Sequence, residues 1–200
     1  MRELYTQFIA YSRALADKIP QYTADDKELG AAPDTLASAI GSICSAISAG
    51  SAPALAPLVP KASPPSNLAS PGDPSNPQLF LAKRDPVCAD WTSALAPFAA
   101  ATRAWGDIDP ALSASQWTPE QKAINDAVGP VMTARADELE QFARRSDNPV
   151  LQDFAVLSAQ YFRAFVVALP TYTGNDSFVV NTAIYLPLFV DAACQTASNG

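Results

Sequence analysis

The segment YSRALADKIPQYTADD at residues 11–26 recurs as YFRAFVVALPTYTGND at residues 161–176, 150 positions further along the chain. When residues 11–44 are placed on residues 161–194 without gaps, nine of 34 positions are identical, including Cys44 and Cys194 at the last position. Self-similarity at a fixed offset is the signature of an internal duplication. The alternative is two amphipathic helices that resemble each other through composition alone. We predict two copies of one helix–turn–helix unit.

Apolar side chains at helical spacing predict two helices in each copy, at residues 2–19 and 26–48 and at residues 148–169 and 176–197. A proline ends the first helix of each copy, because proline lacks the amide donor that a continuing helix needs. The second copy is preceded by two further helices, predicted at 86–105 and 118–145. Their start signals are Asp85-Pro86 and the capping box Thr118-Pro119-Glu120-Gln121.

No useful run of alternating apolar and polar residues occurs, so the fold class is expected to be all-α. We predict a four-helix up-down bundle over 86–197 and a related N-terminal helical hairpin over 2–48. The Pro-, Ser- and Ala-rich residues between them indicate an extended linker, or alternatively a disordered low-complexity segment. The predicted domains are therefore the hairpin 1–48, the linker 49–84 and the four-helix unit 85–200.

The first copy contains only the last two helices of the four-helix unit. Three explanations remain open at this point. The chain is a C-terminal fragment whose other helices lie upstream, another subunit supplies the missing half, or the four-helix unit packs against the hairpin.

Three cysteines occur, at Cys44, Cys88 and Cys194. In an up-down-up-down bundle the start of the first helix and the end of the fourth lie at the same end, on neighbouring helices. A disulfide between Cys88 and Cys194 is the favoured interpretation, and it would indicate an oxidising compartment. Two buried free thiols are the alternative. Cys44 is expected to be unpaired in this chain.

Composition excludes several kinds of function. The net charge is −7 and the 13 Lys and Arg residues form no basic run, which argues against nucleic-acid binding. The chain has no histidine, so Ser–His and Cys–His catalysis are impossible and most zinc sites are improbable. No glycine-rich phosphate loop or paired-carboxylate arrangement is present. We expect no enzyme activity, no cofactor and no metal.

The repeated polar residues have a structural and a functional interpretation. They are Tyr11, Arg13, Tyr22 and Asp26 in the first copy and Tyr161, Arg163, Tyr172 and Asp176 in the second. The structural interpretation is favoured: tyrosine seals the turn, aspartate caps the next helix, and arginine ties the hairpin together. The functional alternative makes the two arginines anion anchors.

Trp105 and Trp117 flank a loop at residues 106–116 that also contains Asp107 and Asp109. Aromatic residues on a loop can anchor a protein partner, and they can also simply pack the loop against its own domain. The two aspartates are too few for a calcium site of the EF-hand kind.

The N-terminal residues predict an amphipathic helix rather than a signal peptide. The best candidate for a membrane span, Phe178–Ala193, is interrupted by Asn181, Pro187 and Asp191 and falls short of the roughly 20 residues required. We therefore expect no membrane span in the chain and an extracytoplasmic location in the periplasm or cell envelope.

These observations favour a non-enzymatic interaction or scaffold domain of the bacterial cell envelope, an accessory subunit that docks to a membrane-protein complex. The alternative is a helical bundle that binds an apolar small molecule or lipid. Kinks at Pro97, Gly129-Pro130 and Pro187 would separate helices and open a cavity for such a ligand.

Overall fold

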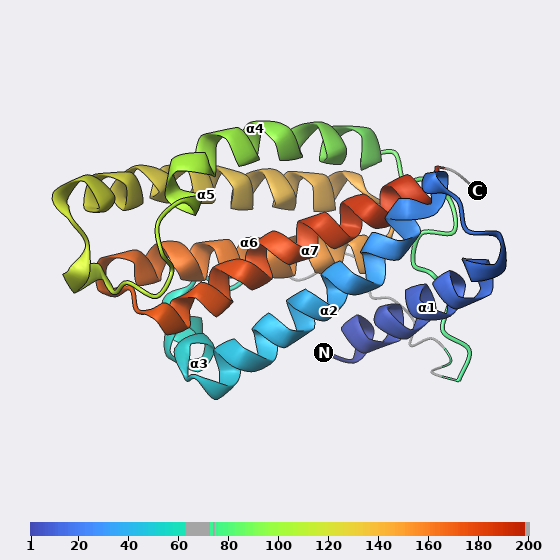
Figure 1. The fold of residues 1–200 in the computed structure, drawn as a ribbon, viewed down its shortest axis with the longest axis horizontal. Coiled ribbons are helices and arrows are strands. Elements are labelled where there is room, and N and C mark those ends of the chain that lie inside the picture. Colours follow the sequence, from blue (N-terminus) through green and yellow to red (C-terminus); the bar gives the residue numbers. More distant parts are fainter. Residues whose placement is uncertain (63–72, 74, 199–200) are drawn as a thin grey trace.

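The computed structural model describes residues 1–62, 73 and 75–198 (Figure 1). Of the described residues 79% are helical and none lies in a strand, so the all-α prediction is confirmed. The α-helices of the described chain are α1 (Arg2–Lys18), α2 (Lys27–Ser48), α3 (Ser51–Leu55), α4 (Cys88–Gly106), α5 (Pro119–Arg145), α6 (Pro149–Ala168) and α7 (Ser177–Thr196).

The helix starts follow the capping signals of the sequence. Thr118 Oγ1 accepts a hydrogen bond from Gln121 N at 3.2 Å, and Gln121 Oε1 accepts one from Thr118 N at 3.0 Å. Asn148 Oδ1 accepts from the first free amides of α6 in the same way. These bonds satisfy amide groups that have no partner inside the helix, and this is why α5 and α6 begin where they do.

Helices α4, α5, α6 and α7 run in alternating directions, with neighbouring pairs packed along their lengths. Helix α7 lies at the centre, between α6 and α2, and α1 packs on the outer side of α2 (Figure 1). The hairpin therefore packs on the four-helix unit, which was the third of the open explanations. Its partner is α7, the counterpart of α2 in the duplication.

Helices α2 and α7 are antiparallel, and the α1–α2 turn and the α6–α7 turn lie at opposite ends of the molecule (Figure 1). An antiparallel contact between two equivalent helices is the arrangement expected for a pseudo-two-fold axis, because each copy then presents the same surface to the other. Leu36 of α2 and its counterpart Leu186 of α7 are both completely buried. The duplication therefore generates the central contact of the fold.

Part of the segment expected to be an extended linker is helical instead. Residues 51–55 form α3, followed by a short 3-10 helix at Ala56–Leu58. Gly50 adopts a positive φ of 83° and turns the chain between α2 and α3. Pro53 falls in the first turn of α3, where its missing amide proton breaks no helical hydrogen bond. The expectation of an extended chain is thus wrong for residues 51–58, while residues 63–72 and 74 of the linker lie outside the described part.

Residues 78–81 also pack against the helices. The Phe80 ring meets Tyr11 of α1, Phe154 of α6 and Phe189 of α7, with ring centroids 5.5–6.1 Å apart. Gln7 holds this segment in register, since its side chain donates to Gln78 O and accepts from Phe80 N. This aromatic cluster joins the first copy to the second at the end of α7.

Pro187 interrupts the hydrogen bonding of α7 without ending the helix. A proline has no amide proton, so the carbonyl of Ala183, four residues earlier, has no helical donor. The hydroxyl of Ser158 on α6 donates to that carbonyl at 2.7 Å. The Pro187 carbonyl in turn accepts from Trp91 Nε1 of α4 at 2.9 Å. Pro187 thus supplies two contacts that join α7 to its neighbours, and it also lines a groove beside α4.

Within the described part of the chain, two helical segments are long and apolar enough to cross a membrane, by length and composition alone. They are Pro149–Thr171 and Gly174–Thr196, each of 23 residues. The bent pair Ala24–Ser48 and Ser51–Leu58 would count as a third if it formed one span. The expectation that no segment meets this criterion is therefore wrong, because the helical segment around Phe178–Ala193 extends beyond the apolar run that sequence inspection singled out.

Candidate functional site: the unequal surfaces of the two copies

The repeated motif builds the same turn in both copies. In the first copy, Asp26 Oδ2 accepts from Thr23 N at 2.8 Å and from Thr23 Oγ1 at 3.0 Å. Asp176 and Thr173 make the same two bonds at the same distances in the second copy. The backbone bond from Thr23 is the main reason that the pKa of the Asp26 carboxyl is lowered. Threonine and aspartate thus have a structural role at both turns.

The two repeated arginines make different contacts. Arg163 donates to Glu140 and Asp137 of α5, and its hydrogen bond to Glu140 is the main cause of its raised pKa. Arg13 has no helix of this kind beside it and donates to Ser75 O at 3.1 Å. The guanidinium that fastens α5 to α6 in the second copy therefore binds a loop carbonyl in the first.

The first tyrosine of the motif lies in the contact between the copies. Tyr11 is completely buried, with its ring edge-on to Phe189 of α7 at 5.4 Å, and burial raises the pKa of its phenol. The pKa of Tyr161 is raised mainly by burial and to a smaller extent by the nearby Cys44. Each tyrosine thus packs near the second helix of the other copy.

The second tyrosine of the motif shows how differently the two turns are covered. Tyr172 is only 6% exposed, whereas Tyr22 is 44% exposed. The Tyr172 hydroxyl donates to Pro110 O at 2.7 Å, and its ring stacks on Trp117 at 5.6 Å. Burial raises the pKa of Tyr172 to about 12. Among the described residues, no segment gives Tyr22 a comparable cover.

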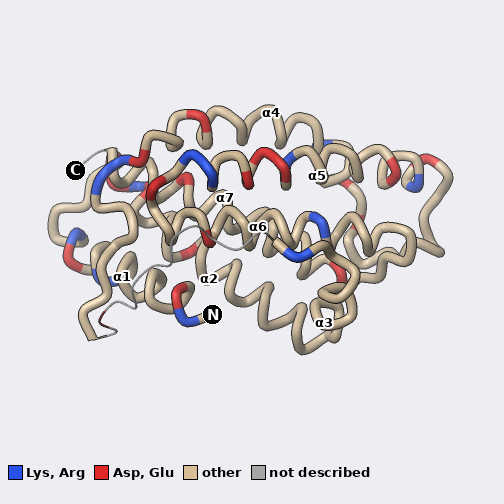
Figure 2. Tube along the Cα trace, turned by 180° about the vertical axis from the view of Figure 1, so that it is seen from behind, with Lys and Arg blue, Asp and Glu red and all other residues tan. Residues whose placement is uncertain are grey.

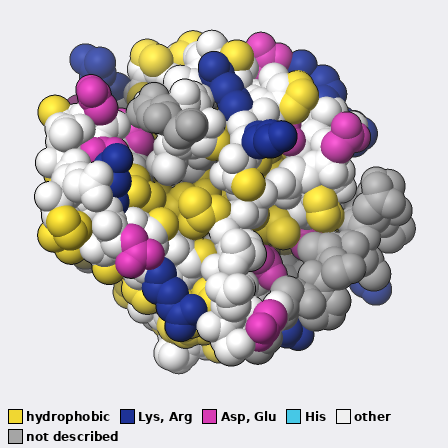
Figure 3. Space-filling view, turned by 90° about the vertical axis from the view of Figure 1, so that its right-hand side faces the viewer, with side chains coloured by type: hydrophobic (Ala, Val, Ile, Leu, Met, Phe, Trp, Pro, Cys, Tyr) yellow, Lys and Arg dark blue, Asp and Glu magenta, His cyan; other side chains and the backbone are white. Residues whose placement is uncertain are grey.

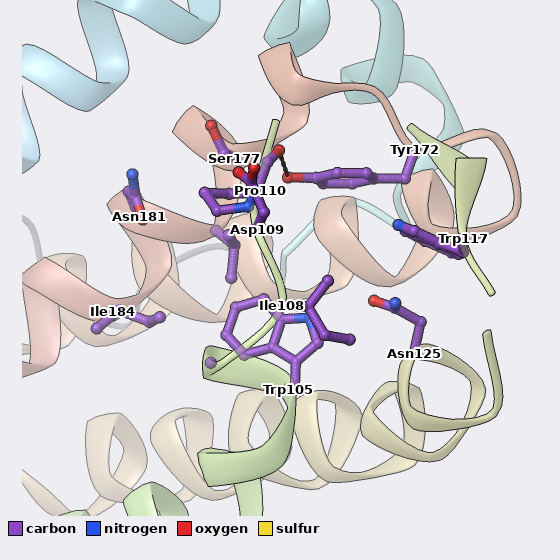
Figure 4. A pocket seen from close by; sticks show the side chains of 12 residues that line it. Trp105, Ile108, Asp109, Pro110, Trp117, Asn125, Tyr172, Ser177, Asn181 and Ile184 are labelled. Carbon is purple, nitrogen blue, oxygen red and sulfur yellow. Dashed lines mark hydrogen bonds between the residues drawn. The ribbon is translucent and has the colours of Figure 1, made fainter. Parts of the chain in front are cut away.

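Trp105 and Trp117 hold the α4–α5 loop against the second copy. Trp105 packs edge-on to Phe165 at 5.5 Å, and Trp117 Nε1 donates to Leu112 O at 3.2 Å. Both rings line a pocket of about 230 Å³, together with Tyr172 and Asn181 (Figure 4). Their role as partner anchors stays a prediction, because these contacts describe only their packing within the chain.

The cysteines also differ in exposure between the two copies. Cys88, at the first position of α4, is bonded to Cys194 near the end of α7, with Cα atoms 5.5 Å apart. Cys44, the counterpart of Cys194, is a free thiol and is exposed. The structure thus contains the disulfide that bundle geometry favoured.

Apolar side chains of the first copy lie exposed where the equivalent positions of the second are buried. Ile19 is 64% exposed, whereas its counterpart Leu169 is 9% exposed and lies beside α5, where a methyl group added at Gly129 would be in van der Waals contact with it. Tyr5 and Ile9 are likewise exposed, whereas their counterparts Ala155 and Ala159 are completely buried. We call this set the open face; it comprises Tyr5, Ile9, Ile19, Tyr22 and Cys44.

The surroundings of the open face combine an apolar depression with a charge-free stretch of α2. The depression, between α1 and α2, is lined by Leu15, Ile19 and Tyr22, with Lys27 and Asp34 at the same site. Figure 3 views the molecule from the end at which the α1–α2 turn lies and shows hydrophobic side chains gathered in a hollow, with charged side chains around it. Residues 35–60 contain no charged residue, and Figure 2 shows α2 nearly free of them, in contrast to α5. Depletion of charge is typical of the core of a protein interface.

A second apolar surface lies between α4 and the helices below it. A groove of about 420 Å³ is lined mainly by apolar residues, among them Phe98, Phe162 and Leu188, together with the side chain of Arg135. Arg135 is 3% exposed, and its guanidinium lies over the Phe98 ring at 5.6 Å. Its Nη1 donates to Glu138 at 2.5 Å, while its buried Nη2 has no hydrogen-bond partner. Sequence reasoning missed Arg135, because only the fold shows that this arginine is buried.

No group of three or more His, Cys, Asp or Glu side chains able to hold a metal occurs in the described part of the chain. Asp109, in the loop considered for calcium, accepts from Ala111 N at 2.9 Å and so stabilises its own turn.

The fold and these surfaces define an all-helical protein built on an internal duplication, with a free face on one copy. The family model described as mycobacterial ESX-1 associated protein matches residues 1–198, and the chain belongs to this family. ESX-1 is a secretion system, and association with it fits an accessory protein of the cell envelope.

An uncharacterized protein of Mycolicibacterium smegmatis (strain MKD8) is 46% identical over 199 residues. The match covers 100% of this chain and 53% of the relative, so the chain spans about half the length of this curated relative. No solved structure matches the chain.

Proposed function

We propose that this protein is a non-enzymatic scaffold of the ESX-1 secretion system, which docks to a component of the secretion complex through the open face of the first copy. The observation that carries the proposal is the contrast between Ile19 and Tyr22, which are exposed, and Leu169 and Tyr172, which are buried. Leaving such side chains in water forgoes roughly 1.5–3 kcal/mol for each large apolar residue that a partner would bury.

A non-enzymatic role is supported by where the polar residues are used. The chain has no histidine, the repeated threonine and aspartate are engaged in the turns, and Arg163 ties two helices together. The free thiol at Cys44 has no adjacent histidine that would activate it as a nucleophile.

An extracytoplasmic location is also part of the proposal. The Cys88–Cys194 disulfide supports it, since structural disulfides persist mainly in oxidising compartments. Alkylation of thiols in intact mycobacterial cells that express the present chain by itself, with a reagent that does not cross membranes, tests this location through labelling of Cys44.

The docking test uses the full chain carrying an affinity tag in a mycobacterium that has an ESX-1 system. ESX-1 components recovered after mild cross-linking are quantified by mass spectrometry. We expect Ile19→Glu to reduce their recovery by roughly tenfold or more, because burying a charge in an apolar interface without a partner is costly.

Leu58→Glu is the matched control. Leu58 is 62% exposed, nearly the same as Ile19 at 64%, but it lies outside the open face. Equal recovery of ESX-1 components with both variants would contradict the proposal. So would a recovery with the unaltered tagged chain that does not exceed that from an untagged strain.

A second candidate function is the binding of a single-chain lipid anion in the groove beside Arg135. The groove offers apolar walls for an acyl chain, and the unpartnered Nη2 of a buried guanidinium offers a donor to a carboxylate. Isothermal calorimetry with palmitate measures this directly. We expect Arg135→Met to abolish binding and Arg145→Met, at a surface ion pair with Asp90, to leave it intact. Absence of palmitate binding to the unaltered chain would exclude the function.

A further inference from the structure

The partner of the open face can be described in more detail, because the second copy shows what covers the equivalent surface. Cys194 is 1% exposed and bonded to the first residue of α4. Leu169 lies beside α5, and Tyr172 donates to the α4–α5 loop and stacks on Trp117. One helical pair, α4–α5 with its connecting loop, therefore covers both ends of the second copy.

The first copy keeps the groups that α4–α5 would contact. Cys44 is exposed at the position of Cys194, and Tyr22 at that of Tyr172. Arg13, at the position of the arginine that binds two carboxylates of α5, has a loop carbonyl as its partner. The first copy thus presents a thiol, a phenol, a guanidinium and the aliphatic side chains of Ile9 and Ile19. Each lies at the position that its counterpart has in the covered copy.

The length of the relative identifies where such a helical pair is encoded. The chain covers 53% of the Mycolicibacterium smegmatis protein, and the remaining part is longer than α4, the loop and α5 together. The first copy of the duplication lacks only these elements within the present chain.

We propose that the open face binds a helical pair equivalent to α4–α5, contained in the part of the longer family member outside the match, and that a cysteine at the start of that pair forms a disulfide with Cys44. This inference rests on the proposed function, since the component that occupies the open face is then the polypeptide segment that carries this helical pair. The pair brings an aromatic ring onto Tyr22 and carboxylates to Arg13.

The covalent step is a thiol–disulfide exchange. The thiolate of the partner cysteine first attacks the disulfide of an oxidised thiol oxidoreductase of the envelope, which breaks that S–S bond and gives a mixed disulfide and one free thiol on the oxidoreductase. The Cys44 thiolate, formed by loss of its proton to solvent, then attacks the partner sulfur and forms the new S–S bond. The oxidoreductase leaves as a thiolate and takes up a proton, so that it ends as the reduced dithiol.

The test uses the full-length relative with its matched half replaced by the present chain. Disulfides are mapped by mass spectrometry after digestion without reduction. We expect the peptide containing Cys44 to be linked to a cysteine from outside the match. In the Cys44→Ser variant that cysteine becomes open to alkylation, and Cys88–Cys194 remains intact.

Hydrogen exchange and thermal unfolding give a second readout that does not depend on the disulfide. Amide exchange in α1 and the α1–α2 turn is expected to be roughly tenfold to a hundredfold slower in the chimera than in the present chain alone. Ile19→Glu should lower the thermal midpoint of the chimera but not of the chain alone, and Leu58→Glu should change neither.

A free Cys44 in the chimera overturns the inference, and so does a disulfide between the Cys44 residues of two copies or a relative without a cysteine outside the match. Unchanged exchange in α1 overturns it as well. Recovery of ESX-1 components that depends on Ile19 would still support the proposed function in each of these cases, so the two failures are distinguishable.

Discussion

The α1–α2 turn and the α6–α7 turn contain the same hydrogen bonds at the same distances, yet one tyrosine is half exposed and the other is sealed. The difference lies in what surrounds each turn. In the second copy α4, α5 and their loop supply a disulfide, a stacked tryptophan and two carboxylates. In the first copy the same positions lie exposed or contact a loop.

The comparison separates what a duplicated sequence specifies locally from what its neighbours add. The turn geometry depends on residues within the motif, so it is identical in both copies. Burial depends on other segments of the chain, so it differs. Residues that match in sequence and differ in burial are therefore the positions at which a partner is expected, and residues buried in both copies belong to the common core.

The largest expected effect contrasts the disulfide of the second copy with the free thiol of the first. Cys88→Ser removes a disulfide that closes a separation of 106 residues, and loss of such a link costs roughly 4–5 kcal/mol in the chain-entropy model. Cys44→Ser should change stability by less than about 0.5 kcal/mol, as is usual for exposed positions. Urea unfolding of both variants under non-reducing conditions measures the contrast. Similar losses for both would mean that Cys44 already has a structural role in this chain.

Leucines buried in both copies should behave alike. Leu36 and Leu186 are each completely buried, and truncation of such a side chain to alanine costs roughly 2–5 kcal/mol. We expect Leu36→Ala and Leu186→Ala to lower the free energy of unfolding by about 3 kcal/mol each. Ile47→Ala, at a side chain of α2 that is 54% exposed, serves as the control. If only Leu186→Ala were destabilising, the first copy would not be part of the cooperative core.

The second tyrosine of the motif should show an intermediate difference. Tyr172→Phe leaves the Pro110 carbonyl without its donor, and the loss of one such bond costs about 1 kcal/mol. Tyr22→Phe should be neutral within a few tenths of a kcal/mol, because its hydroxyl lies at an exposed turn. Thermal unfolding followed by circular dichroism measures both. In the chimera with the longer relative, Tyr22→Phe should become as costly as Tyr172→Phe.

Much of this architecture could be predicted from the sequence, because the signals are local. Proline ends α1 and α6, and the capping box at Thr118 begins α5, so helix ends were predicted to within a few residues. The antiparallel order of α4 and α7 was enough to bring Cys88 to Cys194. The repeated aspartate was expected to cap the following helix, whereas its carboxylate accepts from the threonine three residues earlier and closes the turn before that helix.

The features that were missed depend on tertiary contacts. Helix α3 follows a glycine in a Pro-rich segment, whose composition favours extended chain, and it is held by Ser51 donating to Asn175 O of the α6–α7 turn. Phe80 lies in the same kind of sequence but fills a gap among three aromatic rings. Arg135 looks like an exposed helix residue until α4 covers it. No pattern along the chain encodes such neighbours.

The smallest expected effect is a dependence of the first turn on pH. The pKa of Asp26 is lowered, mainly by the backbone hydrogen bond from Thr23 and further by Lys18, whose ammonium lies 3.2 Å away. Because the fold favours the carboxylate, this stabilisation is fully present above the ordinary pKa of 3.8 and is lost as pH falls through the lowered value. Asp26→Asn should therefore reduce the acid dependence of unfolding measured by urea titration at successive pH values. If the free energy of unfolding fell with acid as steeply in the variant as in the unaltered chain, the ion pair with Lys18 and the turn would contribute nothing to acid stability. The two turns would then be equivalent in geometry only.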